Sequence, residues 1–412
     1  MPMQNQLEEY YRRSSNALRL VRYIVLLIFI LFLLSCIFLF RNDITLDNIQ
    51  YLMKYADFYG SSDTNDTSDI SISADSESQM LMLRDNLAVI SKSGIGLYEF
   101  SGRKLFNYNF SYSNPGIAYD DRNILVYDIS GTEISIFNSF SRVYSQKYPY
   151  SVKSGCINDS GFAIVTNEKT YRSGVIAYNS KYEEVFRWMS ADRYVSALAL
   201  NDIGTRLACC AVTSQNGVYD TKIIIYDLTS GEVDSEISLS DELPLKIVYS
   251  EDSSRIILIT DSMIHFYNTK LEDEKTYKYN QSKIDKYFLS DRMVVISESN
   301  NLSGNSMTLI GFDYSGQQLF SENADSKVSD ISIGKDMLYA LSPQYVYCYA
   351  INDDLSVEPE GKFATGSQYR HILSDSSDRY IVADTKSAHR SSVEDSQKEL
   401  AEKIENADTE NV

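Results

Sequence analysis

The sequence predicts an all-β protein: a β-propeller of eight blades preceded by one N-terminal transmembrane helix. Three observations predict this fold. The chain has a long apolar run near its N-terminus, 32 tyrosines but one tryptophan, and a polar turn that recurs along the rest of the chain. Tyrosine favours strands over helices, and a repeat of this kind is typical of propellers and other arrays.

The apolar run at residues 23–40 is the predicted transmembrane helix. Residues 24–40 contain no charge and no proline, and Val21 and Tyr23 extend the stretch towards the roughly 20 residues that cross the hydrocarbon layer. The side chains expected to anchor it in lipid are Tyr23, Ile24, Phe29, Phe32 and Phe40.

The charges on either side of the run predict its direction. Four arginines precede it, whereas the residues after it are balanced or slightly acidic. The positive-inside rule places the N-terminal segment, residues 1–22, in the cytoplasm and the rest of the chain outside the cell. The arginines that set this orientation are Arg12, Arg13, Arg19 and Arg22.

Three alternatives to a membrane span deserve comparison. A cleaved signal peptide is disfavoured because the run is long and no small-x-small cleavage site precedes Arg41. A lipoprotein stays open because Leu33-Leu34-Ser35-Cys36 resembles a lipobox, although apolar residues continue to Phe40. A core helix is disfavoured by the arginine cluster and by the lack of amphipathic period.

The segment between the run and the repeats divides in two. Residues 41–59 carry apolar side chains at helical spacing after Thr45, which predicts a juxtamembrane amphipathic helix. Residues 60–78 are dominated by Ser, Asp and Thr and are expected to form a polar linker.

The first recurrent turn is an aromatic residue followed by Asp or Asn and small polar residues. Such turns suit hairpins, because Asx side chains bond nearby backbone donors and Gly or Asn accepts positive φ. The aromatic positions are Phe137, Tyr178, Tyr226, Tyr267 and Phe312. Residues 98–102, which begin at Tyr98, are a looser copy, and with Tyr98 included the intervals are 39 to 48 residues.

A second recurrent turn falls about half a unit away from the first. Short β-rich runs lie between the two kinds of turn and amount to about four strands per unit. Four strands in a unit of this length is the pattern of a propeller blade. We count seven units and the first two strands of an eighth, and expect residues 69–74 to complete the last sheet. Eight blades are favoured and seven are the alternative; a β-sandwich does not predict so even a period.

The propeller is therefore expected over residues 79–385. Residues 386–412 are polar and acidic, with one weak helical pattern, and are interpreted as a tail.

Several short motifs resemble a known family. They are Ser113-Asn114-Pro115, Leu125-Val126-Tyr127-Asp128, the run at 161–166 and Val185-Phe186-Arg187-Trp188. The chain resembles a domain-of-unknown-function family of single-pass, membrane-anchored, propeller-like proteins of clostridial and related Gram-positive bacteria, from the anchor through about Leu341. The resemblance implies an envelope location and a propeller fold, and it transfers no functional residue.

No catalytic or cofactor motif stands out, and the catalytic, cofactor and metal assignments are none. Of the three histidines, His265 alternates within an apolar strand and is expected to be a partnered sheet residue, whereas His371 is the candidate for a channel position. Three scattered histidines without Cys-x-x-Cys do not form the usual zinc site. The net charge of −19 disfavours nucleic acid as a partner.

The predicted function is a membrane-tethered, extracytoplasmic, non-catalytic interaction or scaffold module at the cell envelope. Its expected partners are the lipid bilayer, through one helix, and an envelope protein or glycan. Tyr148, Pro149, Tyr150, Arg193 and Tyr194 are candidate contacts. The alternative is a glycan-acting hydrolase or lyase that uses carboxylates in the propeller channel.

Overall fold

A computed structural model describes residues 21–32, 35, 69–272, 275–280, 284–301, 306–375 and 379–398. The chain divides into two compact units, residues 1–63 and 64–412.

The first unit contains a helix at residues 21–32, and the apolar side chains that it carries are 43% to 72% exposed. Among the described residues, none of the helices combines the length and the apolar character that a membrane crossing requires. The transmembrane helix predicted at 23–40 is therefore not supported by the described residues. Residues 33–34 and 36–40 of the predicted run lie outside them, as does the predicted amphipathic helix at 41–59.

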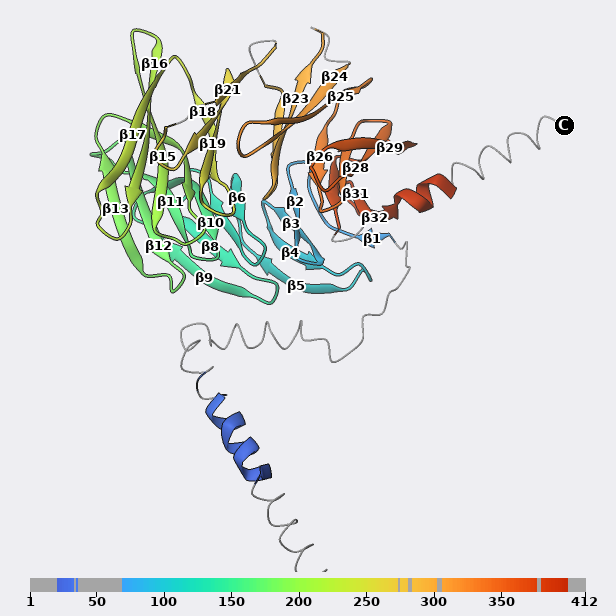
Figure 1. Cartoon of the computed structure of the whole chain (residues 1–412), viewed down its shortest axis with the longest axis horizontal. Helices are drawn as coiled ribbons and strands as arrows, with labels where there is room; N and C mark the ends of the chain where they lie inside the picture. Colours follow the sequence, from blue (N-terminus) through green and yellow to red (C-terminus); the bar gives the residue numbers. More distant parts are fainter. Residues whose placement is uncertain are drawn as a thin grey trace, which may run out of the picture. The chain divides into compact units, whose positions relative to one another are not determined.

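The second unit consists of eight four-stranded antiparallel sheets, which confirms the predicted eight-bladed propeller (Figure 1). Blades 1 to 4 are built in chain order from strands β2 to β17. Blade 1 comprises β2 (Gln79–Leu83), β3 (Asn86–Ser91), β4 (Gly94–Tyr98) and β5 (Lys104–Asn109); blade 2 comprises β6 (Pro115–Tyr119), β7 (Ile124–Asp128), β8 (Glu133–Phe137) and β9 (Arg142–Lys147); blade 3 comprises β10 (Ser151–Asn158), β11 (Gly161–Asn167), β12 (Ser173–Asn179) and β13 (Glu184–Ser190); blade 4 comprises β14 (Tyr194–Leu200), β15 (Arg206–Gln215), β16 (Val218–Asp227) and β17 (Val233–Ser240).

Blades 5 to 8 follow the same plan. Blade 5 comprises β18 (Pro244–Tyr249), β19 (Arg255–Thr260), β20 (Met263–Asn268) and β21 (Lys275–Lys278); blade 6 comprises β22 (Lys286–Leu289), β23 (Met293–Ser299), β24 (Met307–Asp313) and β25 (Gln318–Ala324); blade 7 comprises β26 (Asp330–Ile333), β27 (Met337–Leu341), β28 (Tyr345–Ile351) and β29 (Val357–Ala364); blade 8 comprises β30 (His371–Ser374), β31 (Arg379–Ala383), β32 (Ser387–Ser392) and β1 (Ile70–Ser71).

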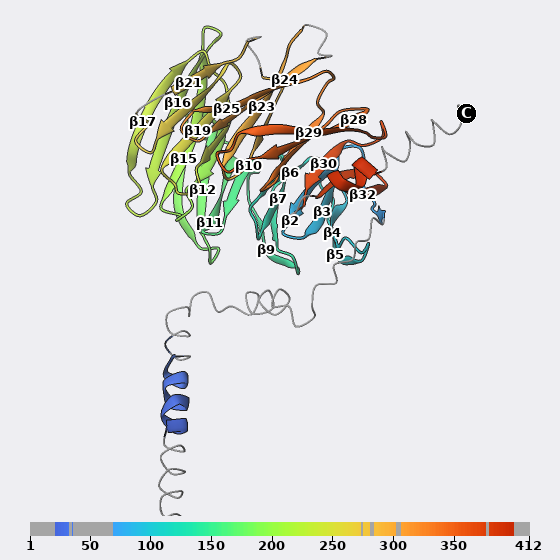
Figure 2. The same ribbon diagram turned by 45° about the vertical axis from the view of Figure 1, so that its right-hand side comes forward.

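The first strand of each blade is the inner strand of the ring. Inner strands of neighbouring blades contact each other, among them β10 with β14, β14 with β18, and β30 with β2. Figures 1 and 2 show the sheets following one another around the ring, from β2 to β32. We call the face on which the inner strands begin the entry face and the opposite one the exit face.

Blade 8 is closed by the two ends of the propeller sequence. Ile70 pairs with Ala388 and Ser71 with Ser387, so an N-terminal strand completes a sheet made of C-terminal strands. This confirms the expectation that the segment at 69–74 completes the last sheet. The chain supplies three strands here rather than two, because β32 lies beyond residue 385, where the sequence analysis ended the propeller. A short helix follows at residues 393–398.

The hydrophobic core is divided into eight clusters, one between each pair of adjacent blades. The cluster between blades 2 and 3 joins Leu125 and Ile134 to Phe162 and Ile176, for example. The cluster between blades 8 and 1 joins Ile70 and Ile381 to Leu87 and Val89. Every blade therefore buries both of its faces, as a closed ring requires.

The aromatic residues of the first recurrent turn lie at or next to the end of the third strand of their blades and are buried. In blades 2 to 6 the next residue is Asp or Asn, and its side chain accepts backbone N–H groups of the following turn. The Oδ1 atom of Asp227 accepts from Thr229 at 2.8 Å, and that of Asn268 accepts from Lys270 at 2.9 Å. These bonds are the Asx turns that the sequence predicts.

Four of the five cysteines lie in the described part of the propeller, and none of those four forms a disulfide. Cys209 and Cys210 are buried in the clusters on opposite sides of blade 4, as expected for neighbours on one strand. Cys36 lies outside the described residues.

Candidate functional site

The inner strands offer little for catalysis. Asp330 is the only carboxylate within these eight strands, all of which the structure describes. Its Oδ2 atom accepts the backbone N–H of Ile372 at 3.0 Å and lies 3.7 Å from Nδ1 of His371. A glycoside hydrolase needs a pair of carboxyl groups, and the inner strands do not supply one.

Exposed aromatic and aliphatic side chains gather instead on the entry-face ends of blades 3, 4 and 5. They are between 37% and 50% exposed, and each belongs to a strand end or to a connection on this face. We call them the aromatic patch: Tyr171, Tyr194, Val218, Tyr219 and Leu245.

Arginine side chains link the members of the patch. The Arg172 guanidinium stacks over the ring of Tyr194 at 5.1 Å. Arg193, which precedes Tyr194, donates from Nη2 to Oδ2 of Asp220 at 2.5 Å, and Asp220 follows Tyr219. The Arg193–Asp220 pair therefore holds the backbone next to Tyr194 against the strand that carries Tyr219.

The patch extends onto a long hairpin. Strands β15 and β16 have ten residues each and stay paired to Gln215 and Val218. In Figures 1 and 2 this hairpin projects at the top of the molecule. It raises Val218 and Tyr219 at its tip, where they are open to a partner.

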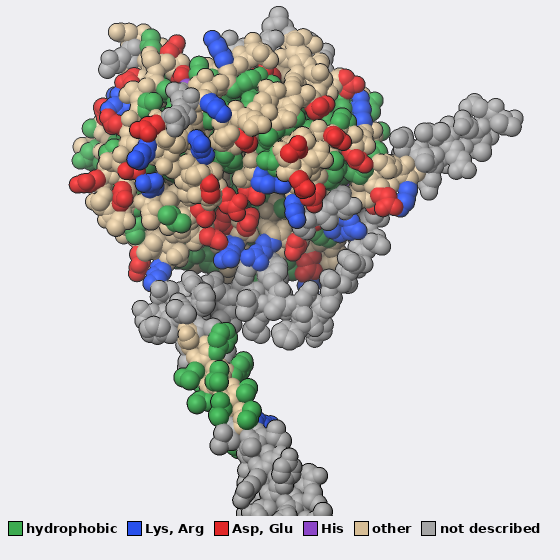
Figure 3. Space-filling model, viewed as in Figure 1, with side chains coloured by type: hydrophobic (Ala, Val, Ile, Leu, Met, Phe, Trp, Pro, Cys, Tyr) green, Lys and Arg blue, Asp and Glu red, His purple; other side chains and the backbone are tan. Residues whose placement is uncertain are grey.

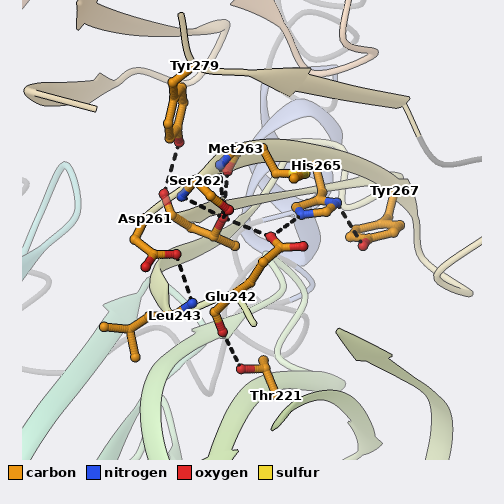
Figure 4. A network of polar contacts seen from close by, with 10 residues as sticks. Thr221, Glu242, Leu243, Asp261, Ser262, Met263, His265, Tyr267 and Tyr279 are labelled. Atoms are coloured by element: carbon orange, nitrogen blue, oxygen red, sulfur yellow. Dashed lines mark hydrogen bonds and ion pairs between the residues drawn. The ribbon is translucent and has the colours of Figure 1, made fainter. Parts of the chain in front are cut away.

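A buried polar network braces the base of the hairpin (Figure 4). Its centre is Glu242, in the connection between blades 4 and 5. The Glu242 side chain lies with Oε2 at 2.7 Å from Nε2 of His265 and accepts the Thr260 hydroxyl at 2.9 Å. Its backbone carbonyl accepts the Thr221 hydroxyl, on β16, at 2.7 Å.

The residues on either side of Glu242 are also held. The N–H of Asp241 donates to the carbonyl of Tyr219 at 2.7 Å, and the N–H of Leu243 donates to Oδ1 of Asp261 at 2.9 Å. Tyr219 and Leu245 are thus positioned by one connection that is itself fixed to blade 5.

The electrostatics of the network favour an ionised Glu242. Burial alone would raise the pKa of this carboxyl. The hydrogen bond and charge of His265 and the hydroxyl of Thr260 outweigh burial, so the pKa lies below its ordinary value. Glu242 and His265 are 8% and 2% exposed, and the Tyr267 hydroxyl lies 3.3 Å from the other imidazole nitrogen of His265. The network is a structural support, since solvent does not reach it.

A comparison with known protein families identifies the family of this chain. The family of unknown function DUF5711 matches residues 56–390, which is most of the chain. The chain belongs to DUF5711. This confirms the resemblance to an uncharacterised family of propeller-like proteins. No curated protein matches the chain by sequence.

Several solved structures are similar to this DUF5711 chain. The C-terminal WD40 domain of Sif2 has a TM-score of 0.54 at 11% identity, over 79% of this chain and 96% of that one. BamB from Moraxella catarrhalis has a TM-score of 0.49 at 12% identity, over 78% and 96%. The Cps50 (Swd1) β-propeller domain from Myceliophteria thermophila has a TM-score of 0.44 at 12% identity, over 79% and 99%. The similarity to the Sif2 domain supports the propeller fold alone.

The candidate contacts predicted from the sequence of this DUF5711 chain differ in their exposure. Tyr194 lies in the aromatic patch and Arg193 beside it. Tyr148 is buried, and its hydroxyl donates to that of Tyr178 at 3.1 Å, so it is no surface contact. Pro149 is exposed and Tyr150 is half-buried, both before β10 on the entry face.

The N-terminal candidates of the DUF5711 chain are only partly described. Tyr23, Ile24, Phe29 and Phe32 are exposed on the helix at 21–32, which also carries Arg22. Arg12, Arg13, Arg19 and Phe40 lie outside the described residues.

Sequence reasoning missed Tyr171, Val218, Tyr219 and Leu245 of the patch. One signal was available: the interval of 48 residues from Tyr178 to Tyr226 is the longest in the repeat series. It corresponds to the extended hairpin of blade 4.

Proposed function

We propose that this protein is a non-catalytic docking module whose aromatic patch binds a protein partner. The observation that carries the proposal is the patch itself, in which Tyr194 and Tyr219 are exposed while their backbones are fixed by Arg193 and by the connection at Glu242. Tyrosine and arginine dominate binding hot spots, and side chains held on a rigid support lose little entropy on binding. Figure 3 shows acidic and basic side chains interspersed over the visible face, which is unlike the large basic surface of a nucleic-acid binder.

We further propose that residues 23–40 anchor the protein in the cell membrane, with the N-terminus in the cytoplasm and the propeller outside. The proposal rests on the uncharged run of 24–40 and on the arginines before it. The exposed apolar side chains of the helix at 21–32 are consistent with burial in lipid. The envelope partner, in this proposal, is a protein on the same side of the membrane.

Site-specific photo-crosslinking in intact cells tests the docking function. A photo-reactive amino acid replaces Tyr194 in one variant and Ile203, which is 69% exposed on an exit-face turn of the same blade, in the control. We expect a discrete adduct from position 194 that a second substitution, Tyr219→Ala, removes, and no such adduct from position 203. The same adducts at both positions, or none at position 194, would contradict the proposal.

A topology reporter tests the anchor. A reporter fused after Val412 should be active only outside the cytoplasm, and the chain should stay with membranes after alkaline extraction. Reporter activity confined to the cytoplasm would contradict the proposed orientation. Complete release of the chain from membranes by alkaline extraction would contradict the proposed anchor.

A further inference from the structure

A second feature lies away from the aromatic patch, in the groove between blades 1 and 2. The groove has a volume of about 300 Å³ and is bounded by β5 and the segment after it on one side and by β8 and β9 on the other. This volume is at the lower end of the range of small-molecule sites, about 300 to 1,000 Å³. Eight of its twelve lining residues carry polar or charged side chains.

One wall of the groove is an aromatic platform. The rings of Phe110 and Tyr112 stack with centroids 4.3 Å apart, and the ring of Tyr108 lies 5.4 Å from that of buried Phe137. Tyr108 and Phe110 are half-buried, so part of each ring is open to the groove. Because Phe137 is fully buried between the blades, the platform is held in place before any ligand arrives.

The other wall is polar. Ser145, on the outermost strand of blade 2, is exposed and pairs with Ser135, so its hydroxyl lies on the face of the sheet that meets blade 1. No hydrogen bond of its side chain is found within the described part of the chain. Arg142 stacks over Tyr108 at 4.4 Å, and no carboxylate of the described residues pairs with it. Lys147 is paired with Glu133 at 3.2 Å. The Ser145 hydroxyl and the Arg142 guanidinium are therefore available to a ligand.

This combination fits a sugar better than an apolar ligand or a strong anion. A pyranose ring presents C–H groups on its faces, which pack on aromatic rings, and hydroxyl groups on its edges, which bond to hydroxyl and guanidinium groups. An apolar ligand would leave the Ser145 hydroxyl and the Arg142 guanidinium without hydrogen-bond partners. A strong anion would meet Arg142 together with the carboxylate of Glu133. We propose that this groove is a binding site for a neutral oligosaccharide.

The test uses the full chain in a detergent without a sugar headgroup, because a glycoside detergent would compete. Calorimetric titration measures the binding of four- to six-unit oligosaccharides of glucose, of N-acetylglucosamine and of mannose. We expect at least one of them to bind, and the Ser145→Trp variant to weaken that binding at least tenfold, because the indole fills the groove. Ser145 faces the groove from an exposed strand, so this variant should keep the unfolding temperature of the wild type.

Two further variants sharpen the result. Tyr108→Ala removes part of the platform and should also weaken binding at least tenfold, whereas Tyr119→Ala removes an equally large exposed ring elsewhere and should have no effect. The Ser145→Trp variant should still give the photo-crosslink from position 194, which separates this site from the docking function. The inference is overturned if no sugar of the panel binds, or if folded Ser145→Trp protein binds as the wild type does.

Discussion

The carboxylate of Glu242 and the imidazole of His265 meet at 2.7 Å inside the propeller, although the two residues belong to a connection and to the third strand of a blade. The pair joins blade 5 to the loop that carries the chain from blade 4. Because both side chains are almost fully buried, each compensates for the burial of the other.

Replacing Glu242 should destabilise the propeller. Glu242→Ala removes the carboxylate oxygen that contacts Nε2 of His265 and accepts the Thr260 hydroxyl, and we expect a loss of about 3 kcal/mol in the free energy of unfolding. Glu242→Gln keeps the shape and one acceptor and should cost about 1 kcal/mol. Denaturant unfolding measures both. The exposed Glu251→Gln is the control and should stay within about 0.5 kcal/mol of the wild type; equal effects of all three variants would contradict the structural role.

The contribution of Glu242 should depend on pH in a defined direction. Its pKa is below the ordinary value of 4.5 in the folded protein. The unfolded state therefore takes up the proton first as pH falls, and the stabilisation is fully present above about pH 5 and is lost as pH falls through the lowered value. The difference in unfolding free energy between wild type and Glu242→Gln should shrink below about pH 4. A difference that grows with acidity would show that the pKa is raised.

Truncation of the patch tyrosines should weaken partner binding without affecting stability. Tyr194→Ala and Tyr219→Ala each remove an exposed ring, and we expect at least a tenfold loss of affinity for the crosslinked partner, which is about 1.4 kcal/mol. Binding of the purified partner by calorimetry measures it. Ile203→Ala is the matched control on the exit face. Unchanged affinity in both tyrosine variants would place the interface elsewhere.

Loss of the closing strand should loosen the contact between blades 8 and 1. Ile70 is fully buried between Ile381 and Leu87, and Ile70→Ala should cost about 3 kcal/mol. Hydrogen exchange should then rise first in β32 and β31. Ser71→Ala, at the exposed neighbouring position, should change neither quantity. Uniform destabilisation without local exchange would mean that the strand adds stability but does not hold the ring closed.

The propeller cysteines should resist thiol reagents. Burial raises the pKa of Cys156 to about 12 and that of Cys209 well above its ordinary value. In a Cys36→Ser variant at about pH 8, no thiol should react until the protein unfolds, because the thiolate is the reactive form. Labelling is followed by mass spectrometry. Rapid modification of Cys209 in the folded protein would contradict its burial.

Much of the fold is predictable from the sequence because residues of the same chemical type recur at the same place in successive blades. In blades 2 to 6 an aromatic residue followed by Asp or Asn lies at or next to the end of the third strand, and the side chain of the Asp or Asn accepts backbone N–H groups of the turn. The strand at Ile70 was also predictable, since it alternates apolar and polar residues before the first unit. β32 was not predictable, because Ser387–Ser392 contains only one small apolar residue, Ala388. This segment forms a strand because it pairs with the strands on either side of it.

The site was less predictable. That His265 is a partnered sheet residue followed from its alternation, but its partner Glu242 lies 23 residues away in a connection whose path depends on tertiary contacts. The sequence predicts Tyr148 as a surface contact, but its side chain is buried and its hydroxyl donates to that of Tyr178. Which aromatic side chains are exposed depends on how adjacent blades pack, and a single sequence does not encode that in any local pattern.

The pairing of β1 with β32 also constrains how the chain is made. Ile70 and its partner Ala388 are 318 positions apart, so one of them leaves the ribosome long before the other exists. Until synthesis is almost complete, blade 1 has no neighbour on one side and presents Leu87 and Val89 to solvent. Such long-range closure is slow and exposes the unfinished chain to aggregation. A chain cut short before β30 therefore lacks blade 8 and leaves the apolar faces of blades 7 and 1 uncovered.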